Sequence, residues 1–139
     1  MSFFNIGEAA KRSGIHVKMI RYYEEQGLLS KLKRSDAGYR LYQENDIQIL
    51  LFIKSARELG FSINEIKKLL DLWKNKKRSN QDVKKIAQKH IEKLQNKMEE
   101  LKAMLSTLEN LVKCCQGNDR PECPILDILS RASHTLYTK

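Results

Sequence analysis

The sequence lacks any uninterrupted apolar segment of about 18 residues, which is the length that a membrane-spanning helix needs. Its N-terminus also lacks the charged segment followed by an apolar one that marks a secretory signal. We therefore expect a soluble, cytoplasmic protein with no membrane partner. The 139 residues leave room for one ordinary domain, or for a small domain and an extended element.

Combinations of catalytic residues are also missing. The three histidines, His16, His90 and His134, are scattered along the chain, and no Ser/His/Asp set or useful pair of carboxylates is apparent. An enzyme is therefore the class of protein that we expect least.

Positive charge is abundant and unevenly distributed. The net charge is +9, and residues 1–78 carry 16 Lys and Arg against 9 Asp and Glu, whereas residues 79–139 carry 10 against 8. Most of the surplus therefore belongs to the first half of the chain. Such asymmetry is typical of a module that neutralises nucleic-acid phosphates, although a solvated basic surface gives the same composition.

All three cysteines, Cys114, Cys115 and Cys123, lie within ten residues of one another. Cys115 and Cys123 enclose seven residues, among them a glycine and a proline that suit a loop bringing two sulfurs together. In a cytoplasmic protein, an odd number of clustered thiols favours a metal or redox site over a disulfide framework.

Two short helices followed by a β-hairpin are predicted at the N-terminus. Asn5 begins the first helix with a capping pair, and the helix stops at Ser13. The second follows the turn at Gly14 and ends near Gly27, so the pair is a helix-turn-helix candidate. Residues 30–42 place a turn between two short runs that favour β-strands, which predicts a two-stranded wing.

Two further helices and a hinge complete the predicted N-terminal domain. Apolar spacing predicts a helix through residues 47–59, and a capping box at Ser62 and Glu65 opens another that ends near Trp73. Residues 74–79 form a charged hinge.

A long helix with a regular apolar seam is predicted from Asp82 onward. Apolar residues alternate at spacings of four and three, which is the pattern of a coiled coil. These 26 residues would span roughly 39 Å, too long a stripe for a small domain to cover, so we expect a second copy of the chain to cover it. An intramolecular amphipathic helix is the alternative. The seam consists of Ala87, Ile91, Leu94, Met98, Leu101, Leu105, Leu108 and Val112.

With these elements in place, the chain resembles the MerR family of transcription regulators over almost its whole length. The resemblance is carried by Arg21-Tyr-Tyr-Glu-Glu-Gln-Gly-Leu28 and Gly38-Tyr-Arg-Leu-Tyr42, together with the coiled coil. The Cys-x7-Cys loop followed by Pro-Ile-Leu is similar to the copper-efflux branch of the family. The resemblance implies a homodimer with winged N-terminal domains and an antiparallel coiled coil, which holds DNA with and without metal.

Lys18 and Arg21 lie three residues apart near the start of the second helix and so share a face that can enter the major groove. Arg21 is the best candidate for reading a base, with a phosphate contact as the equal alternative. Tyr22 could donate its hydroxyl to a phosphate, whereas Tyr23, on the opposite face, is expected in the core. His16 either caps the helix or reaches a phosphate, and the sequence does not decide between the two.

The resemblance assigns further phosphate contacts to the wing. Arg34, Tyr39 and Arg40 match family positions that bind phosphate beside the recognition helix, and a guanidinium suits that contact. Arg57 is a weaker candidate from the second pair of helices.

Two thiolates, from Cys115 and Cys123, satisfy a soft monovalent ion such as Cu(I), with Ag(I) and Au(I) as mimics, whereas Zn(II) usually takes four ligands. The family's divalent-metal sensors add a cysteine near the start of the long helix, where this chain has Ser79-Asn80-Gln81, and Asn80 replaces a common serine. Cys114 is either a bystander or a ligand of a divalent-metal sensor. A redox disulfide between Cys115 and Cys123 is the remaining alternative.

The sequence thus predicts a mainly α fold with four parts: a winged helix-turn-helix domain (1–75), a dimerisation helix (80–113), a metal-binding loop with a short capping helix (114–132) and a flexible tail (133–139). The predicted function is Cu(I)-responsive activation of metal efflux or detoxification promoters, in which distortion of the DNA lets RNA polymerase engage both promoter elements. A divalent-metal sensor and, more remotely, a cytoplasmic metal buffer are the alternatives.

Overall fold

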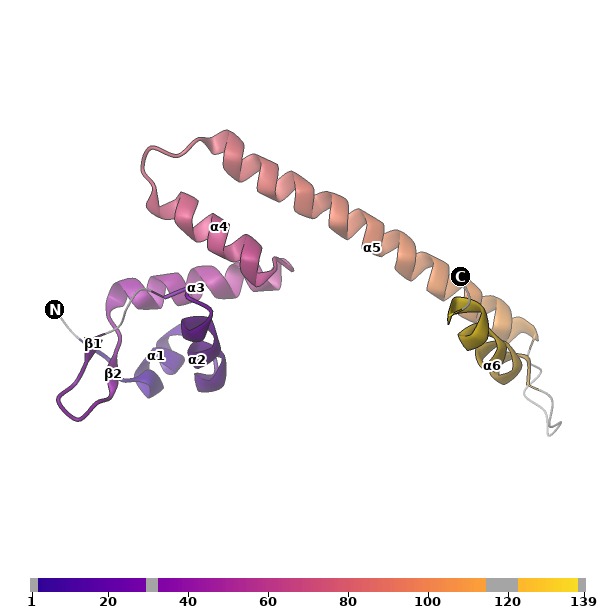
Figure 1. The fold of residues 1–139 in the computed structure, drawn as a ribbon, viewed down its shortest axis with the longest axis horizontal. Coiled ribbons are helices and arrows are strands. Elements are labelled where there is room, and N and C mark those ends of the chain that lie inside the picture. The colour runs from indigo at the N-terminus through magenta and orange to yellow at the C-terminus, as the bar shows by residue number, and fades with distance from the viewer. Residues whose placement is uncertain (1–2, 30–32, 115–122, 138–139) are drawn as a thin grey trace. The chain divides into compact units, whose positions relative to one another are not determined.

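The computed structural model describes residues 3–29, 33–114 and 123–137, and these are mainly helical (Figure 1). They form two compact units, Met1–Gln88 and Lys89–Lys139. The predicted mainly α fold with a winged helix-turn-helix is confirmed. The boundary between the units lies inside the long helix, whereas the sequence predicts the end of the DNA-binding domain at residue 75.

Helix α1 (Ile6–Ser13) and helix α2 (Val17–Glu25) form the helix-turn-helix. The Asn5 side chain caps α1 by accepting from the Glu8 N–H at 2.8 Å. Gly14 ends α1 with a φ of 73°, a left-handed backbone conformation that strains other residues, so this turn favours glycine. His16 Nδ1 accepts from the Lys18 N–H at 3.2 Å, which makes His16 the N-cap of α2.

The wing is a short antiparallel hairpin. Strand β1 (Lys33–Arg34) pairs with β2 (Arg40–Leu41), and the Ser35 and Tyr39 backbones close the turn with a 2.7 Å hydrogen bond. The hairpin is tied to the N-terminus by Tyr42, which exchanges backbone hydrogen bonds of 2.7 and 2.8 Å with Phe4.

Helices α3 (Glu44–Glu58) and α4 (Ile63–Lys74) complete the unit. The predicted capping box of α4 is present, since Ser62 and Glu65 exchange side-chain to backbone hydrogen bonds of 2.9 and 3.2 Å. Helix α3 begins three residues before the predicted apolar stretch because Asp46 Oδ2 accepts from the Gln43 N–H at 2.8 Å and stabilises its first turn.

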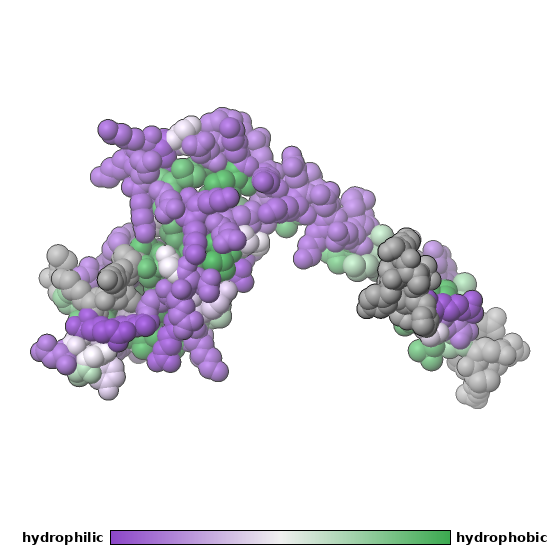
Figure 2. All heavy atoms as spheres, in the orientation of Figure 1, coloured by the Kyte–Doolittle hydropathy of each residue, from purple (hydrophilic) through white to green (hydrophobic). Residues whose placement is uncertain are grey.

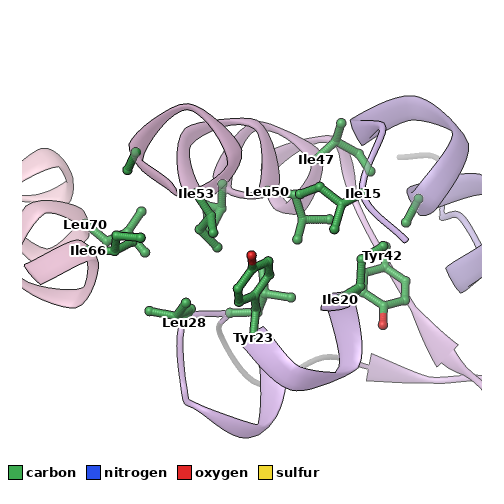
Figure 3. Close-up of a cluster of buried hydrophobic side chains, with 14 residues drawn as sticks. Ile15, Ile20, Tyr23, Leu28, Tyr42, Ile47, Leu50, Ile53, Ile66 and Leu70 are labelled. Atoms are coloured by element: carbon green, nitrogen blue, oxygen red, sulfur yellow. The ribbon is translucent and has the colours of Figure 1, made fainter. Parts of the chain in front are cut away.

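One hydrophobic core joins these four helices with the segment after α2 and the end of the wing (Figure 3). Ile20 from α2, Tyr42 from the wing, Leu50 and Ile53 from α3 and Ile66 from α4 are fully buried. Burial of each such side chain contributes roughly 1.5–3 kcal/mol, so the core holds the helix-turn-helix and the wing in one body.

Helix α5 (Asn80–Cys114) carries the predicted seam, and helix α6 (Pro124–Tyr137) follows the cysteine loop. Among the described residues from Ile91 to Val112, the seam side chains are between 43% and 62% exposed in the single chain, whereas Leu111 is only 6% exposed. Helix α6 continues beyond residue 130, where we predicted fraying and then a flexible tail. The helix extends to Tyr137 because no glycine or proline follows Pro124 to stop it earlier, and the flexibility of the tail stays a prediction.

The buried carboxyl of Asp46 gives a pH-dependent prediction. Burial raises the pKa of Asp46 above its ordinary value, and the hydrogen bond from the Gln43 N–H offsets this only in part. The folded protein then binds this proton more tightly than the unfolded chain does, so ionisation of Asp46 costs stability as the pH rises through the raised pKa. Asp46→Asn keeps an acceptor for the Gln43 N–H without the charge.

We expect the free energy of unfolding of Asp46→Asn to equal or exceed that of the wild type at neutral pH. The difference should shrink as the pH falls below the ordinary pKa range of aspartate. Urea unfolding followed by circular dichroism at several pH values measures this, with the exposed Asp71→Asn as the control. If the wild type instead became more stable relative to Asp46→Asn as the pH rises, the pKa of Asp46 would not be raised in the folded protein.

Candidate nucleic-acid interface

Helix α2 has one buried face and one exposed face. Ile20 is fully buried and Tyr23 is 5% exposed, whereas Lys18, Arg21 and Tyr22 are exposed. Since residues three apart lie on the same side of a helix, Lys18 and Arg21 project together from the face that the core leaves open. The predicted burial of Tyr23 and exposure of Tyr22 are both observed.

A cleft of about 290 Å³ lies between α2 and the wing. Arginines from three elements line it, Arg21 from α2, Arg34 from β1 and Arg40 from β2, with Glu25 as its acidic residue. Three guanidinium groups around one cleft favour an oxyanion such as phosphate. Two of its oxygens can accept a pair of hydrogen bonds from one guanidinium. Tyr39, at the wing turn, is 72% exposed and lines the same cleft.

The structure gives the wing arginines partners within the protein. Arg34 Nη1 donates to the Gly38 carbonyl at 2.9 Å, which stiffens the wing turn. Arg40 Nη1 forms an ion pair with Glu24 Oε2 of α2, a contact that the sequence did not predict. In the chain alone Arg40 is paired with Glu24, and its contact with phosphate stays a prediction.

Tyr42 adds a second link to the same carboxylate. Its hydroxyl donates to Glu24 Oε1 at 2.9 Å. Burial raises the pKa of Tyr42, and the nearby positive charges of Arg40 and Arg21 offset the rise in part. The hydroxyl therefore keeps its proton at neutral pH and remains a donor to Glu24.

Two features lie away from this cleft. Arg57, near the end of α3, is exposed and its Nη1 donates to the Phe61 carbonyl at 3.4 Å. An apolar groove of about 520 Å³ runs along α3 and α4, where the Phe52 and Trp73 rings stack with their centres 4.6 Å apart. Hydrophilic side chains otherwise cover most of the face of the N-terminal unit that Figure 2 shows.

The thiols lie at the ends of two helices. Cys114 is the last residue of α5 and is exposed. Cys123 is half-buried, and its carbonyl accepts from the Asp127 N–H at 3.0 Å, so it begins α6. Cys115 lies outside the described residues. Within those residues, no group of three or more potential metal-ligating side chains is gathered, whereas a two-thiol site at Cys115 and Cys123 would involve the loop.

Sequence reasoning missed the role of Glu24. Its position three residues after Arg21 was visible, and an acidic residue on an otherwise basic interface helix is a signal in itself. The partner could not be identified, because Glu24 and Arg40 belong to elements that only the folded chain brings together. The link between α2 and the wing therefore emerges from the structure alone.

The exposed basic helix face beside a basic wing defines a winged helix-turn-helix DNA-binding protein. Residues 4–73 match the family model "MerR HTH family regulatory protein", and residues 47–111 match "MerR, DNA binding". The chain belongs to the MerR family of transcription regulators, which bind promoter DNA and function as dimers; members of the family are regulators and not enzymes.

Individual relatives connect this fold with metals. The chain is 46% identical to heavy metal-dependent transcription regulator 2 of Rhizobium meliloti, covering 93% of this chain and 88% of that protein. It is 36% identical to the transcriptional regulator CueR of Salmonella typhimurium, covering 94% of each. It is also similar to the crystal structure of the regulator PbrR691 of Ralstonia metallidurans in complex with lead(II), with a TM-score of 0.80, 35% identity and coverage of 91% and 98%.

These likenesses make the chain a MerR-type transcriptional regulator, and heavy-metal dependence is stated in the name of one of these relatives. Among the described residues, no helix combines the length and the apolar character needed to cross a membrane.

Proposed function

We propose that this protein is a homodimeric activator that responds to Cu(I), and to Ag(I) or Au(I) as chemical mimics, and that turns on promoters for metal efflux or detoxification. The observation that carries the proposal is the pairing of a basic cleft at the recognition helix with a two-cysteine loop at the end of a long helix. A relative of the chain named CueR supports the metal-responsive role.

The DNA-binding face consists of α2 and the wing. Lys18, Arg21 and Tyr22 are exposed on α2, where a recognition helix contacts base edges and the neighbouring backbone. Tyr39 and Arg34 border the cleft beside it and bind the phosphate backbone. Arg57, exposed at the end of α3, adds a peripheral phosphate contact.

The dimer forms along α5. Ile91, Leu94, Met98, Leu101, Leu105 and Leu108 are between 43% and 59% exposed, although they lie at the positions that a coiled coil buries. A contiguous apolar stripe of this length on a single chain marks an interface between protein surfaces. A second copy of the helix supplies the complementary seam, because a two-fold dimer pairs one surface with itself.

The two thiols of Cys115 and Cys123 are the metal ligands in this proposal. Soft thiolate ligands suit Cu(I), so these two sulfurs would hold one monovalent ion. Cys123 begins α6 through its carbonyl, so a sulfur held at this residue fixes the start of α6. Asn80, in place of a third thiol, and the absence of a histidine between the cysteines favour this low-coordinate site over a zinc site.

A divalent-metal sensor is the second candidate. The exposed thiol of Cys114 at the end of α5 offers a third sulfur, and the related PbrR691 structure contains lead(II). The side chains of adjacent residues in a helix diverge, so Cys114 and Cys115 would reach one ion only if the helix ended between them.

Activation follows from a difference in affinity between two conformations. The ion can favour one arrangement of the dimer only by binding that arrangement more tightly than the other. The favoured arrangement changes the shape of the bound promoter, so that RNA polymerase engages both promoter elements, which is a use of DNA deformability.

Arg21 is expected to read a base. Arg21→Ala should weaken binding to a duplex selected by the wild-type protein from random DNA by about 1–3 kcal/mol, with a smaller loss on an unrelated duplex. Fluorescence anisotropy measures both affinities. Lys97→Ala, which removes one exposed charge from α5, is the control. An equal loss on both duplexes with a shallower salt dependence would instead make Arg21 a phosphate contact.

Leu101→Glu should break the dimer. Placing a carboxylate in a symmetric apolar seam buries two charges per dimer, so the dissociation constant should rise by at least about 100-fold. Sedimentation velocity over a range of concentrations measures the change. Ala103→Glu adds the same charge at an exposed position outside the seam and should leave the dimer intact. A Leu101→Glu protein that stays dimeric at the wild-type concentration would rule out this seam.

Cys115→Ser and Cys123→Ser should each abolish activation by Cu(I) in a reporter assay without loss of DNA binding, because the sulfurs lie outside the DNA-binding unit. Cys114→Ser should behave as the wild type. Anaerobic titration against a chromophoric competitor should give one Cu(I) per protomer and weak Zn(II) binding. Tight Zn(II) binding that depends on Cys114 would identify the divalent-metal sensor instead.

A further inference from the structure

A single carboxylate joins the recognition helix to the wing. The Glu24 side chain is 12% exposed, and both of its oxygens have partners on the wing: Oε1 accepts from the Tyr42 hydroxyl at 2.9 Å and Oε2 pairs with the Arg40 guanidinium. A hydrogen bond with an ionised partner is roughly twice as strong as one between neutral groups. Rotation of α2 relative to the wing would break both contacts at once.

The wing end of this link is itself fixed. Tyr42 is fully buried in the core and exchanges two backbone hydrogen bonds with Phe4, so the hydroxyl that Glu24 binds has little freedom to move. Arg40 lies opposite Arg34 in the register of the hairpin, and Arg34 in turn binds the Gly38 carbonyl at the turn. The position of Glu24 is thereby connected to the tip of the wing.

The negative charge of Glu24 also reduces the repulsion among the arginines that line the cleft. Arg21, Arg34 and Arg40 all line it, and three like charges so close together repel one another. Glu24 offsets the charge of Arg40 from a half-buried position, where a charge pair is screened less than at the surface. Arg40 is therefore held by the protein, and Arg21 and Arg34 remain for an external anion.

We propose that Glu24 is a positioning residue: it holds the recognition helix and the wing at a fixed separation, by binding Arg40 and Tyr42, so that the two elements read DNA as one rigid unit. Two elements at a fixed separation accept only a DNA whose groove and phosphates match that separation, so they select for DNA shape. This inference rests on the proposed DNA-binding face.

Three variants test the proposal, with Glu25→Ala as the control for charge and Arg34→Gln as the comparison for salt dependence. Glu24→Ala removes both contacts, Glu24→Gln keeps an oxygen for Tyr42 without the charge for Arg40, and Arg40→Gln removes the cation. Glu25→Ala is the matched control, since Glu25 is an exposed neighbour that lines the same cleft, and its removal changes the net charge equally. Thermal unfolding confirms that each variant is folded at the assay temperature.

The measurement is the ratio of affinities for two duplexes of equal length, one selected from random DNA by the wild type and one unrelated. We expect Glu24→Ala to lower this ratio by about tenfold or more, while binding to the unrelated duplex stays equal or becomes tighter. Glu25→Ala should tighten binding to both duplexes alike and keep the ratio. A loss of charge alone therefore cannot produce the expected result.

The salt dependence of Arg40→Gln gives an independent readout. An arginine bound to phosphate contributes about 0.9 to the slope of log affinity against log salt, whereas an arginine bound to Glu24 contributes little. We expect an unchanged slope for Arg40→Gln and a reduced one for Arg34→Gln. If Glu24→Ala does not fold, Glu24→Gln and Arg40→Gln decide the question.

An affinity ratio within twofold of the wild type in the folded Glu24 variants, or a slope reduced by about 0.9 in Arg40→Gln, would overturn the positioning role. A wild-type protein that selects no preferred duplex would instead overturn the proposed DNA-binding function. The two failures are therefore distinguishable.

Discussion

Burial of one face of α2 in the hydrophobic core is the constraint on which the DNA-binding surface depends. Ile20 and Tyr23 lie in the same cluster as Leu50 and Ile53 of α3 (Figure 3). Each such burial contributes roughly 1.5–3 kcal/mol, whereas a solvated surface ion pair contributes about 0–1 kcal/mol. The core therefore fixes the rotation of α2 about its own axis. With that rotation, the face that carries Arg21 is exposed to solvent.

The C-terminal unit is constrained in the opposite way, by apolar surface that its own chain leaves exposed. The N-terminal helices bury their apolar faces in one core, but α5 leaves Leu101, Leu105 and Leu108 more than half exposed. Apolar area left in water costs roughly 25 cal/mol per Å², so exposure of the whole seam carries a large unfavourable free energy. A homodimer removes that exposure, and it also places two recognition helices in one molecule.

Local signals explain what the sequence could predict. The Ser62 and Glu65 capping box, the Gly14 turn and the seam of α5 each depend on residues a few positions apart, and the structure contains all three elements. The C-terminal end of α6 could not be predicted in this way, because a helix without a stop residue has no local signal for where it ends. The ion pair between Glu24 and Arg40 could not be predicted from the sequence. The two residues lie on different elements and meet only after the wing folds onto α2.

Cys114 and Cys123 lie at two helix ends on either side of the proposed sensor loop. Cys114 ends α5, whereas the carbonyl of Cys123 accepts a hydrogen bond at the start of α6. The backbone groups at both helix ends lack partners inside their own helix, so these ends are where a helix frays or extends most readily. An ion held by Cys115 and Cys123, as proposed, would change the free energy of both helix ends at once. Because α5 is one continuous helix from Asn80 to Cys114, it connects the thiol end with the N-terminal unit, where its first turns belong.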